Sequence, residues 1–293
     1  MPTRIPVVSG MFYPADEAAC RREVAECLRS SEPVQATGAV QGGIVPHAGW
    51  AFSGPTAGRV FAALKAQTPP QTIVLFGAVH SWGVSGASMY ASGSWRTPLG
   101  ELPVDEELAQ AVLDAPPPLG GSKGLVSNRP QAHSREHSIE VQLPFIKHLF
   151  ADAHILPIAV PPSPVAHQVG RAIAGVVRGL GRRAPAIGSS DLTHYGPRYG
   201  LTPVGVGDRA LEWTRENDRR LLDLVVRMRA TEIVAEAEAH RNACGAGAIA
   251  ACIAYAAELG ASEGVLLHYT TSHEVMPMGP PSDMVGYGAV IFV

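Results

Sequence analysis

The sequence has few cysteines, little net charge and no long apolar run. Its four cysteines lack zinc-motif spacing and are too few for a disulfide framework in 293 residues. A formal net charge of −3 gives no electrostatic case for binding nucleic acid or an anionic membrane. No apolar stretch is long enough to span a bilayer, and residues 1–6 lack the apolar core of a signal peptide. We therefore expect a cytoplasmic protein without nucleic-acid or membrane partners.

What the chain does contain is enough apolar material for a sizeable core. Hydrophobic residues make up 46% of the sequence, and the mean hydropathy of +0.09 is typical of a globular protein. No internal repeat or linker divides the chain, so we expect one α/β domain over residues 1–293.

Three apolar segments with the character of buried strands are each followed closely by a histidine. The segments 43–45, 71–77 and 184–190 precede His47, His80 and His194, respectively. A helical pattern over residues 53–66 separates the first two segments. Open α/β sheets place their ligand sites at the carboxyl ends of strands, so these histidines are expected to lie at one edge of a sheet.

Other segments carry local signals. Residues 136–143 are expected to open a helix, and 95–100 to form a turn-rich loop. Ser53 or Thr56 could cap the helix over 53–66. The Pro/Gly/Ser-rich stretch 115–130 is expected to be a long loop, either a lid or disordered. Residues 242–245 begin an alanine-rich helix that continues to Leu259.

The residue types at these element ends are those that bind a first-row transition metal. Imidazoles suit Fe, Cu, Zn and Ni, and Asp191 could orient a histidine or bind directly. Cys244 at a helix start would have its thiolate favoured by the helix dipole. His137, flanked by Glu136, is a further pocket candidate. The alternative for any one strand-end histidine is a hydrogen-bonded structural role.

Several motifs resemble those of the Memo family, whose prokaryotic members are called AmmeMemoRadiSam system protein B. The matching segments, in family order, are Gly10-Met11-Phe12-Tyr13-Pro14, Val45-Pro46-His47-Ala48-Gly49-Trp50, Ser53-Gly54, Gly77 with His80, Thr97-Pro98-Leu99-Gly100, Glu136-His137-Ser138-Ile139-Glu140-Val141-Gln142-Leu143-Pro144, Ser189-Ser190-Asp191-Leu192-Thr193-His194 and Ala243-Cys244-Gly245. They extend over nearly the whole chain. The stretches 136–144 and 189–194 are the most specific.

The resemblance implies a three-layer α/β/α fold with a mixed sheet, related to class III extradiol ring-cleaving dioxygenases. Those enzymes bind non-haem Fe(II) through two histidines and a glutamate, with another histidine as acid/base. In the Memo family the pocket is formed by two histidines and a cysteine, which correspond here to His47, His80 and Cys244. Asp191 and His194 would lie beside them as catalytic residues, with His194 at the acid/base position.

Two departures from these patterns bear on function. The thiolate replaces the dioxygenase carboxylate, so ring cleavage does not carry over directly, and a soft ligand favours Fe(II) or Cu over Mg or Ca. The residues after Cys244-Gly245 are Ala246-Gly247-Ala248, where many relatives have a basic residue and a proline. Loss of that charge alters what the pocket would recognise.

Three functions are compatible with these residues. The first is an Fe(II)- or Cu-dependent redox protein with a His47/His80/Cys244 site. The second is a non-catalytic protein that uses the same pocket for a peptide or a partner protein, and the resemblance adds a functional association with a radical-SAM protein. The small-molecule or peptide ligand of the pocket is not identified by the sequence. The third is a metal-free hydrolase with Cys244 as nucleophile. Whether the protein is an enzyme is therefore left open by the sequence.

Overall fold

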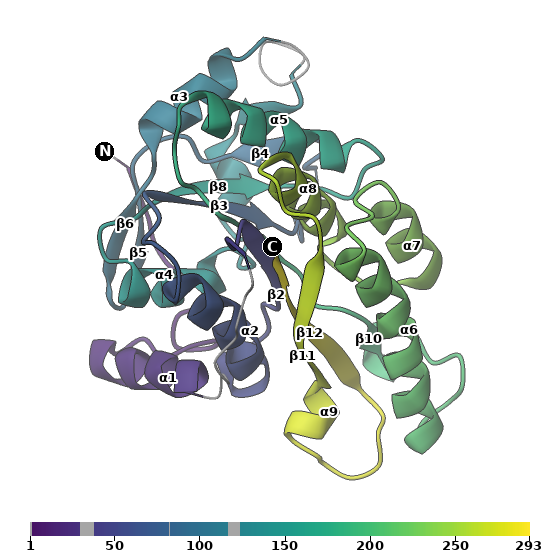
Figure 1. Ribbon diagram of the computed structural model, residues 1–293. Coiled ribbons are helices and arrows are strands. Elements are labelled where there is room, and N and C mark those ends of the chain that lie inside the picture. The colour runs from purple at the N-terminus through teal and green to yellow at the C-terminus, as the bar shows by residue number, and fades with distance from the viewer. Residues whose placement is uncertain (1, 30–37, 82, 117–123) are drawn as a thin grey trace.

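The computed structural model describes residues 2–29, 38–81, 83–116 and 124–293, and is built on a mixed β-sheet (Figure 1). In spatial order the strands of the sheet are β10 (His194–Tyr195), β12 (Met284–Phe292), β2 (Gly42–Val45), β9 (Ala186–Ser189), β3 (Thr72–Gly77), β8 (His154–Ala159), β4 (Ala87–Met89) and β7 (Val126–Asn128), and β11 (Gly264–Thr271) pairs with β12. The predicted α/β fold with a mixed central sheet is confirmed.

The centre of the sheet is parallel and its flanks are partly antiparallel. Strands β2, β9, β3 and β8 run in parallel, whereas β12 pairs with β2 in the antiparallel sense. Val45 is opposite Ser189 in the register of β2 and β9, so these two strands end level with each other. Residues that follow β2, β9 and β3 therefore emerge side by side at one edge of the sheet.

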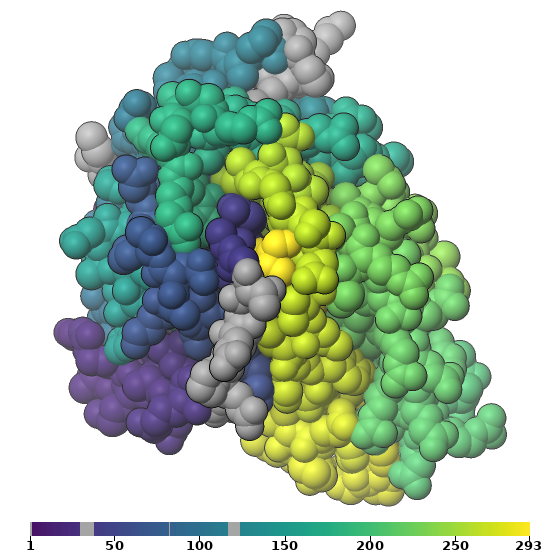
Figure 2. Space-filling model, viewed as in Figure 1, coloured from purple at the N-terminus to yellow at the C-terminus, as the bar shows by residue number. Residues whose placement is uncertain are grey.

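Helices cover both faces of the sheet. On one face α2 (Trp50–Lys65) packs against β2 and β12, and α1 (Glu17–Arg29) and α4 (Leu143–Leu149) pack beside it. The other face carries α8 (Ala246–Glu258), α5 (Ala166–Gly179), α3 (Glu106–Asp114), α7 (Ile233–His240) and α6 (Asp208–Val226). Figure 2 shows the C-terminal strands at the surface between the α1–α2 side and the α6–α7 side.

The sequence of β3 shows why both faces are covered. Ile73 and Leu75 join the core under α2, while Val74 and Phe76 join the core under α8. A strand that is apolar at every position must be buried on both sides, because successive side chains point to opposite faces. On the α8 side, Gly170 of α5 lets the backbone of α8 approach so closely that a Cβ would lie 1.8 Å from the carbonyl oxygen of Ala251.

Two local expectations were wrong. Residues 95–100 are not a loop, because β5 (Ser94–Thr97) and β6 (Gly100–Pro103) form an antiparallel hairpin that pairs with β1 (Thr3–Arg4) in a separate three-stranded sheet. Ser53 and Thr56 do not cap α2, because that helix already begins at Trp50 and both residues lie inside it. The turn signals and the capping residue types were recognised, but the pairing partner of the hairpin was not visible locally.

The segment 136–143 also differs from the expectation. Residues 136–139 are not helical, and the first helical turns are η2 (Glu140–Gln142, a 3-10 helix) and α4. Part of the expected loop 115–130 forms β7 and the start of η1 (Pro130–His133), while residues 117–123 lie outside the described residues. None of the helices in the described part of the chain is long and apolar enough to cross a membrane. The stretch 136–139 matters because it carries two side chains of the site.

Candidate metal centre

His47 lies two residues beyond the end of β2 and is buried, with 2% of its surface exposed. Its backbone N–H donates to Asp191 Oδ1 at 2.7 Å. Asp191 itself lies two residues beyond β9, the neighbouring strand. The level ends of β2 and β9 thus bring a histidine and an aspartate from distant parts of the sequence into direct contact.

The protonation of the His47 ring follows from its neighbours. Ser189 Oγ donates its single proton to the carbonyl oxygen of Ser138 at 2.8 Å. It also lies 3.1 Å from His47 Nδ1 and 3.2 Å from Gln142 Nε2, so it must accept from both. In the neutral ring His47 therefore carries its proton on Nδ1, and its Nε2 lone pair is free.

His80, three residues beyond the end of β3, is held in the same way by a carboxylate. Glu136 is buried, and its oxygens lie 3.0 and 3.1 Å from His80 Nδ1 while Oε2 accepts the His80 backbone N–H at 2.7 Å. Burial would raise the pKa of Glu136, but the hydrogen bond and charge of His80 hold it well below its usual range. An ionised carboxylate only accepts, so His80 Nδ1 also carries a proton.

Cys244 faces the Nε2 side of the His47 and His80 rings. Its Sγ lies 3.2 Å from His47 Nε2. Burial raises the pKa of the thiol, but the charge and hydrogen bond of His47 and the hydrogen bond of His80 outweigh it and bring the pKa to about 6. Burial lowers the pKa of His80, yet hydrogen bonds to Cys244 and Glu136 raise it to about 10. These two shifts favour a thiolate on Cys244 and an imidazolium on His80.

Cys244 reaches this position because of the glycine that follows it. A Cβ on Gly245 would lie 2.5 Å from the carbonyl oxygen of Ser189, so only glycine permits this approach to the end of β9. Helix α8 begins at Ala246 with Gly245 as its N-cap. Cys244 thus lies just before the helix, which begins one residue after the expected segment 242–245.

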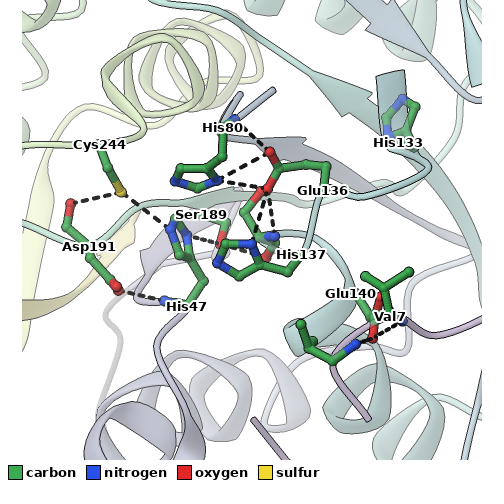
Figure 3. A network of polar contacts seen from close by, with 12 residues as sticks. Val7, His47, His80, His133, Glu136, His137, Glu140, Ser189, Asp191 and Cys244 are labelled. Carbon is green, nitrogen blue, oxygen red and sulfur yellow. Dashed lines mark hydrogen bonds and ion pairs between the residues drawn. The ribbon is translucent and has the colours of Figure 1, made fainter. Parts of the chain in front are cut away.

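A third imidazole joins the first two. One nitrogen from each of His47, His80 and His137 lies within 4.8 Å of the others, a grouping that could hold a metal ion. The rings of His80 and His137 stack with centroids 4.8 Å apart, and His47 meets both edge-on (Figure 3). Burial and the neighbouring His80 charge lower the pKa of His137 to about 4, so this ring is neutral and has a free nitrogen at pH 7.

Asp191 and His194 lie beside the cluster. Asp191 is buried, and burial raises its pKa despite the backbone N–H groups that it accepts. His194, in β10, has its Nδ1 3.0 Å from the carbonyl oxygen of Leu192, which cannot donate. The neutral His194 ring therefore has its proton on Nδ1 and its lone pair on Nε2.

The three histidines form part of the floor of a cavity of about 720 Å³. Asp191 and His194 also line it, and apolar side chains of the walls include Phe12 and Phe52. Its outer wall is the segment around α9 (Ser272–Val275), from which Met276 and Met278 line the cavity. A volume of this size accommodates a small organic molecule.

The donor set suits a transition metal. His47 and His80 each have Nδ1–H engaged by an acceptor, the arrangement that fixes a metal-binding imidazole in the correct tautomer. Cys244 and Glu136 lie at opposite sides of the imidazoles (Figure 3). Imidazole and thiolate donors fit Fe, Cu, Zn or Ni and do not fit Mg or Ca.

The structure brings the residues predicted from the sequence together at one edge of the sheet, but they contribute to the site in different ways. His47, His80, His137 and Cys244 form the cluster, and Glu136 supports it. His194 lines the cavity but has no hydrogen bond to the cluster among the described residues. Asp191 holds the backbone of His47, whereas the His47 ring is oriented by Ser189.

Sequence reasoning missed the part played by Ser189 and Gln142. Gln142 Nε2 donates to the carbonyl oxygen of Pro46 at 2.8 Å and to Ser189 Oγ, so it ties β2 and β9 to the segment before α4. The signal for Ser189 was its position at the end of a strand, the same position that singled out the histidines. Gln142 gave no such signal, and it is fully buried.

Comparison with known proteins agrees with the motifs. A family model described as "Memo-like protein" matches residues 4–291. MEMO1 family proteins of Thermococcus onnurineus and Methanopyrus kandleri are 36% and 33% identical over 300 residues, covering 99% of this chain and 99% and 98% of theirs. The crystal structure of an uncharacterized Escherichia coli K12 protein superposes with a TM-score of 0.54 at 13% identity, over 85% of this chain and 99% of that one. At this identity the likeness concerns the fold alone.

Proposed function

The chain belongs to the Memo-like protein family, and on this premise we propose that it is a metal-dependent redox protein acting on a small molecule. The metal is Fe(II) or Cu, held by His47, His80 and Cys244, with His137 as a further nitrogen donor. The chemistry is of the class III extradiol dioxygenase type in the sense that a non-haem ion and a nearby histidine work together.

The observation that carries the proposal is the shared orientation of two imidazoles. Ser189 and Glu136 occupy the Nδ1 atoms of His47 and His80, which leaves both Nε2 atoms on the side of Cys244. Here the free lone pairs, the low thiol pKa and the cavity coincide at one point.

A bound Fe(II) or Cu ion would supply one-electron chemistry, which no side chain of the cluster provides. His194 Nε2 is the atom that accepts or returns a proton of the substrate, because Nδ1 donates to Leu192. Phe12 and Phe52 exclude water from one wall. Asp191 keeps the turn at His47 in place through the backbone N–H.

Anaerobic loading tests the proposal. Wild-type protein is purified without oxygen, loaded with Fe(II) or Cu(I), and its metal content is measured beside His47→Ala and Cys244→Ser. One equivalent in the wild type and clearly less in both variants is expected. Oxygen uptake is then followed with catechols and ascorbate. Metal content that is unaffected by both substitutions would remove the proposed site.

A non-catalytic binding protein is the second proposal. The observation that favours it is the outer wall of the cavity, where Met276 and Met278 are 44% and 78% exposed. Flexible, exposed methionines are typical of surfaces that bind varied apolar partners. The family resemblance adds a radical-SAM protein as a partner to test. Affinity capture from native lysate that recovers only small molecules would count against this proposal.

A cysteine hydrolase is supported by the Cys244–His47 pair but not by the cavity. The 3.2 Å contact and the low thiol pKa suit a nucleophile. Cys244 is, however, not among the described residues that line the cavity, whereas the three histidines are. Alkylation of metal-free protein distinguishes the hydrolase from the metal-dependent redox protein. Hydrolytic activity that is present without metal and lost on modification of Cys244 would favour the hydrolase.

A further inference from the structure

A second cavity, of about 650 Å³, lies on another side of His80. It is lined by the residues after β3 and by the segment around η1, including Ser81, Gln131 and Ser134. Two arginines, Arg129 and Arg135, also line it. The proposed metal centre uses none of the residues just named, and among the residues that the structure describes His80 is the one that lines both cavities.

The charge of this cavity is unbalanced. Its described lining contains two guanidinium groups and no aspartate or glutamate. Within the described residues, neither Arg129 nor Arg135 has a carboxylate within ion-pair distance or a side-chain hydrogen bond. The Gln131 amide likewise has no hydrogen-bond partner there and can donate.

A cavity elsewhere in the molecule shows the opposite arrangement. In the cavity of about 530 Å³ near β8, Arg182 is paired with both Asp105 and Glu107. A guanidinium that is already paired in this way has little capacity left for an external anion. The contrast indicates that the positive charge beside His80 is available to a ligand.

The two arginines project from firmly held backbone. The backbone N–H of Arg129 donates to the carbonyl oxygen of Met89 at 2.9 Å, directly after β7. Arg135 lies between His133 and Glu136, whose carbonyl oxygens accept from Arg4 at 2.8 and 2.7 Å. Both side chains are exposed, so only their attachment points are fixed. Fixed attachment of two forked donors suits bidentate recognition.

We propose that this second cavity binds an oxyanion, the carboxylate or phosphate group of a small molecule, through Arg129 and Arg135, with Ser81, Ser134 and Gln131 as neutral contacts. Guanidinium groups match carboxylate and phosphate geometry equally well, so the cavity defines the shared chemistry of the ligand. Because His80 is a common wall, a bound anion also lies beside the first cavity and changes the surroundings of that imidazole.

The test is an NMR titration of full-length, metal-free, ¹⁵N-labelled protein. Inorganic phosphate and succinate are added separately, with sodium chloride at matched ionic strength as the reference. Saturable shifts of the Arg129 and Arg135 Nε–H signals are expected with at least one of the two anions and not with chloride. A response to phosphate alone assigns the site to phosphate compounds, and a response to succinate alone assigns it to carboxylates.

The matched variants are Arg129→Gln/Arg135→Gln and Arg22→Gln/Arg209→Gln, which remove the same charge at different places. The first is expected to weaken binding roughly tenfold or more, because each charged hydrogen bond contributes strongly. The second is expected to leave it unchanged. Absence of saturable shifts with both anions, equal binding by the first variant, or equal loss in both variants would overturn the proposal. The remaining amide signals report whether each variant is folded.

Discussion

Two buried polar regions of the molecule use their hydrogen bonds differently. Around Glu140, the hydrogen bonds are made within the protein: the carboxylate accepts from Arg4, Tyr13 and the backbone N–H groups of Val7 and Val8. Around His47 and His80, one nitrogen of each ring is held by the protein and the other faces a thiol.

The difference separates a structural network from a functional one. A network that satisfies all of its own groups contributes to the position of the chain, because nothing is left to bind a ligand. The Glu140 network fixes the N-terminal segment against the residues before α4. The histidine cluster keeps lone pairs unused by the backbone, and these are the groups that a metal would take.

The largest expected effect is loss of stability in Glu140→Gln. This variant leaves the Arg4 guanidinium buried without a charged partner, which typically costs about 3–5 kcal/mol. Chemical denaturation measures the change. Glu101→Gln, which breaks the exposed pair with Arg96, is the control and should move the denaturation midpoint little. Equal midpoints for the two variants would show that the buried network does not hold the N-terminal segment.

The next effect concerns His133, a buried histidine that lines neither of the two cavities described above. Burial, followed by the Arg4 charge, lowers its pKa to about 4. Below an unfolded pKa of about 6.5 the unfolded state binds a proton that the folded state refuses, so stability falls as the pH drops from 6.5 towards 4. The accumulated loss is about 3 kcal/mol.

His133→Gln isolates this contribution. Its amide nitrogen can replace Nε2 as the donor to the Ser88 carbonyl oxygen without titrating. Denaturation curves between pH 7 and pH 4 should therefore be flatter for the variant than for the wild type. Parallel curves would mean that other groups carry the acid sensitivity.

A smaller effect is expected from the groups that orient the imidazoles. Ser189→Ala removes the acceptor of His47 Nδ1–H, and Glu136→Gln removes the charge beside His80. Each should lower metal affinity about 10- to 100-fold with little change in the ligands themselves. Ser88→Ala, a buried serine that donates to Gly86, is the matched control. Wild-type metal affinity in Ser189→Ala would contradict the assigned tautomer.

The smallest effect is expected at the outer wall of the first cavity. Thr271 and Glu274 form a reciprocal cap at the start of α9, so this polar group is satisfied like those around Glu140. Thr271→Ala should cost about 1 kcal/mol in denaturation experiments and leave metal affinity unchanged. A change in metal affinity of the size expected for Ser189→Ala would contradict the distinction between structural polar networks and the histidine cluster.

Much of the site was accessible from the sequence because parallel strands end at a common edge. The apolar segments before His47, His80 and Asp191 were recognised as strands, and those strands are β2, β3 and β9. The pairing order β2-β9-β3 was not predictable, since β9 lies more than a hundred residues beyond β3 in sequence. The role of Ser189 depends on this order, because it reaches His47 only when β2 and β9 are neighbours.

His137 is a second residue whose place in the site could not be predicted from the sequence. Helical periodicity around residues 136–143 directed attention to the apolar face of a helix, whereas residues 136–139 precede the first helical turn and bring His137 against His80. The hairpin of β5 and β6 was missed for the same reason: its strands are short, and their pairing with β1 is a long-range contact. Local propensity carries no information about such partners.

The sequence by itself determined the family, the α/β class and the residue types of the site, because buried strands and family motifs can be recognised from short stretches of sequence. Only the tertiary structure decided which nitrogen of each imidazole is held by the protein, that a third histidine joins the cluster, and that Cys244 lies against His47 with a lowered thiol pKa. Tautomers and pKa values depend on acceptors and charges a few ångströms away, and folding brings those groups from segments more than fifty residues apart.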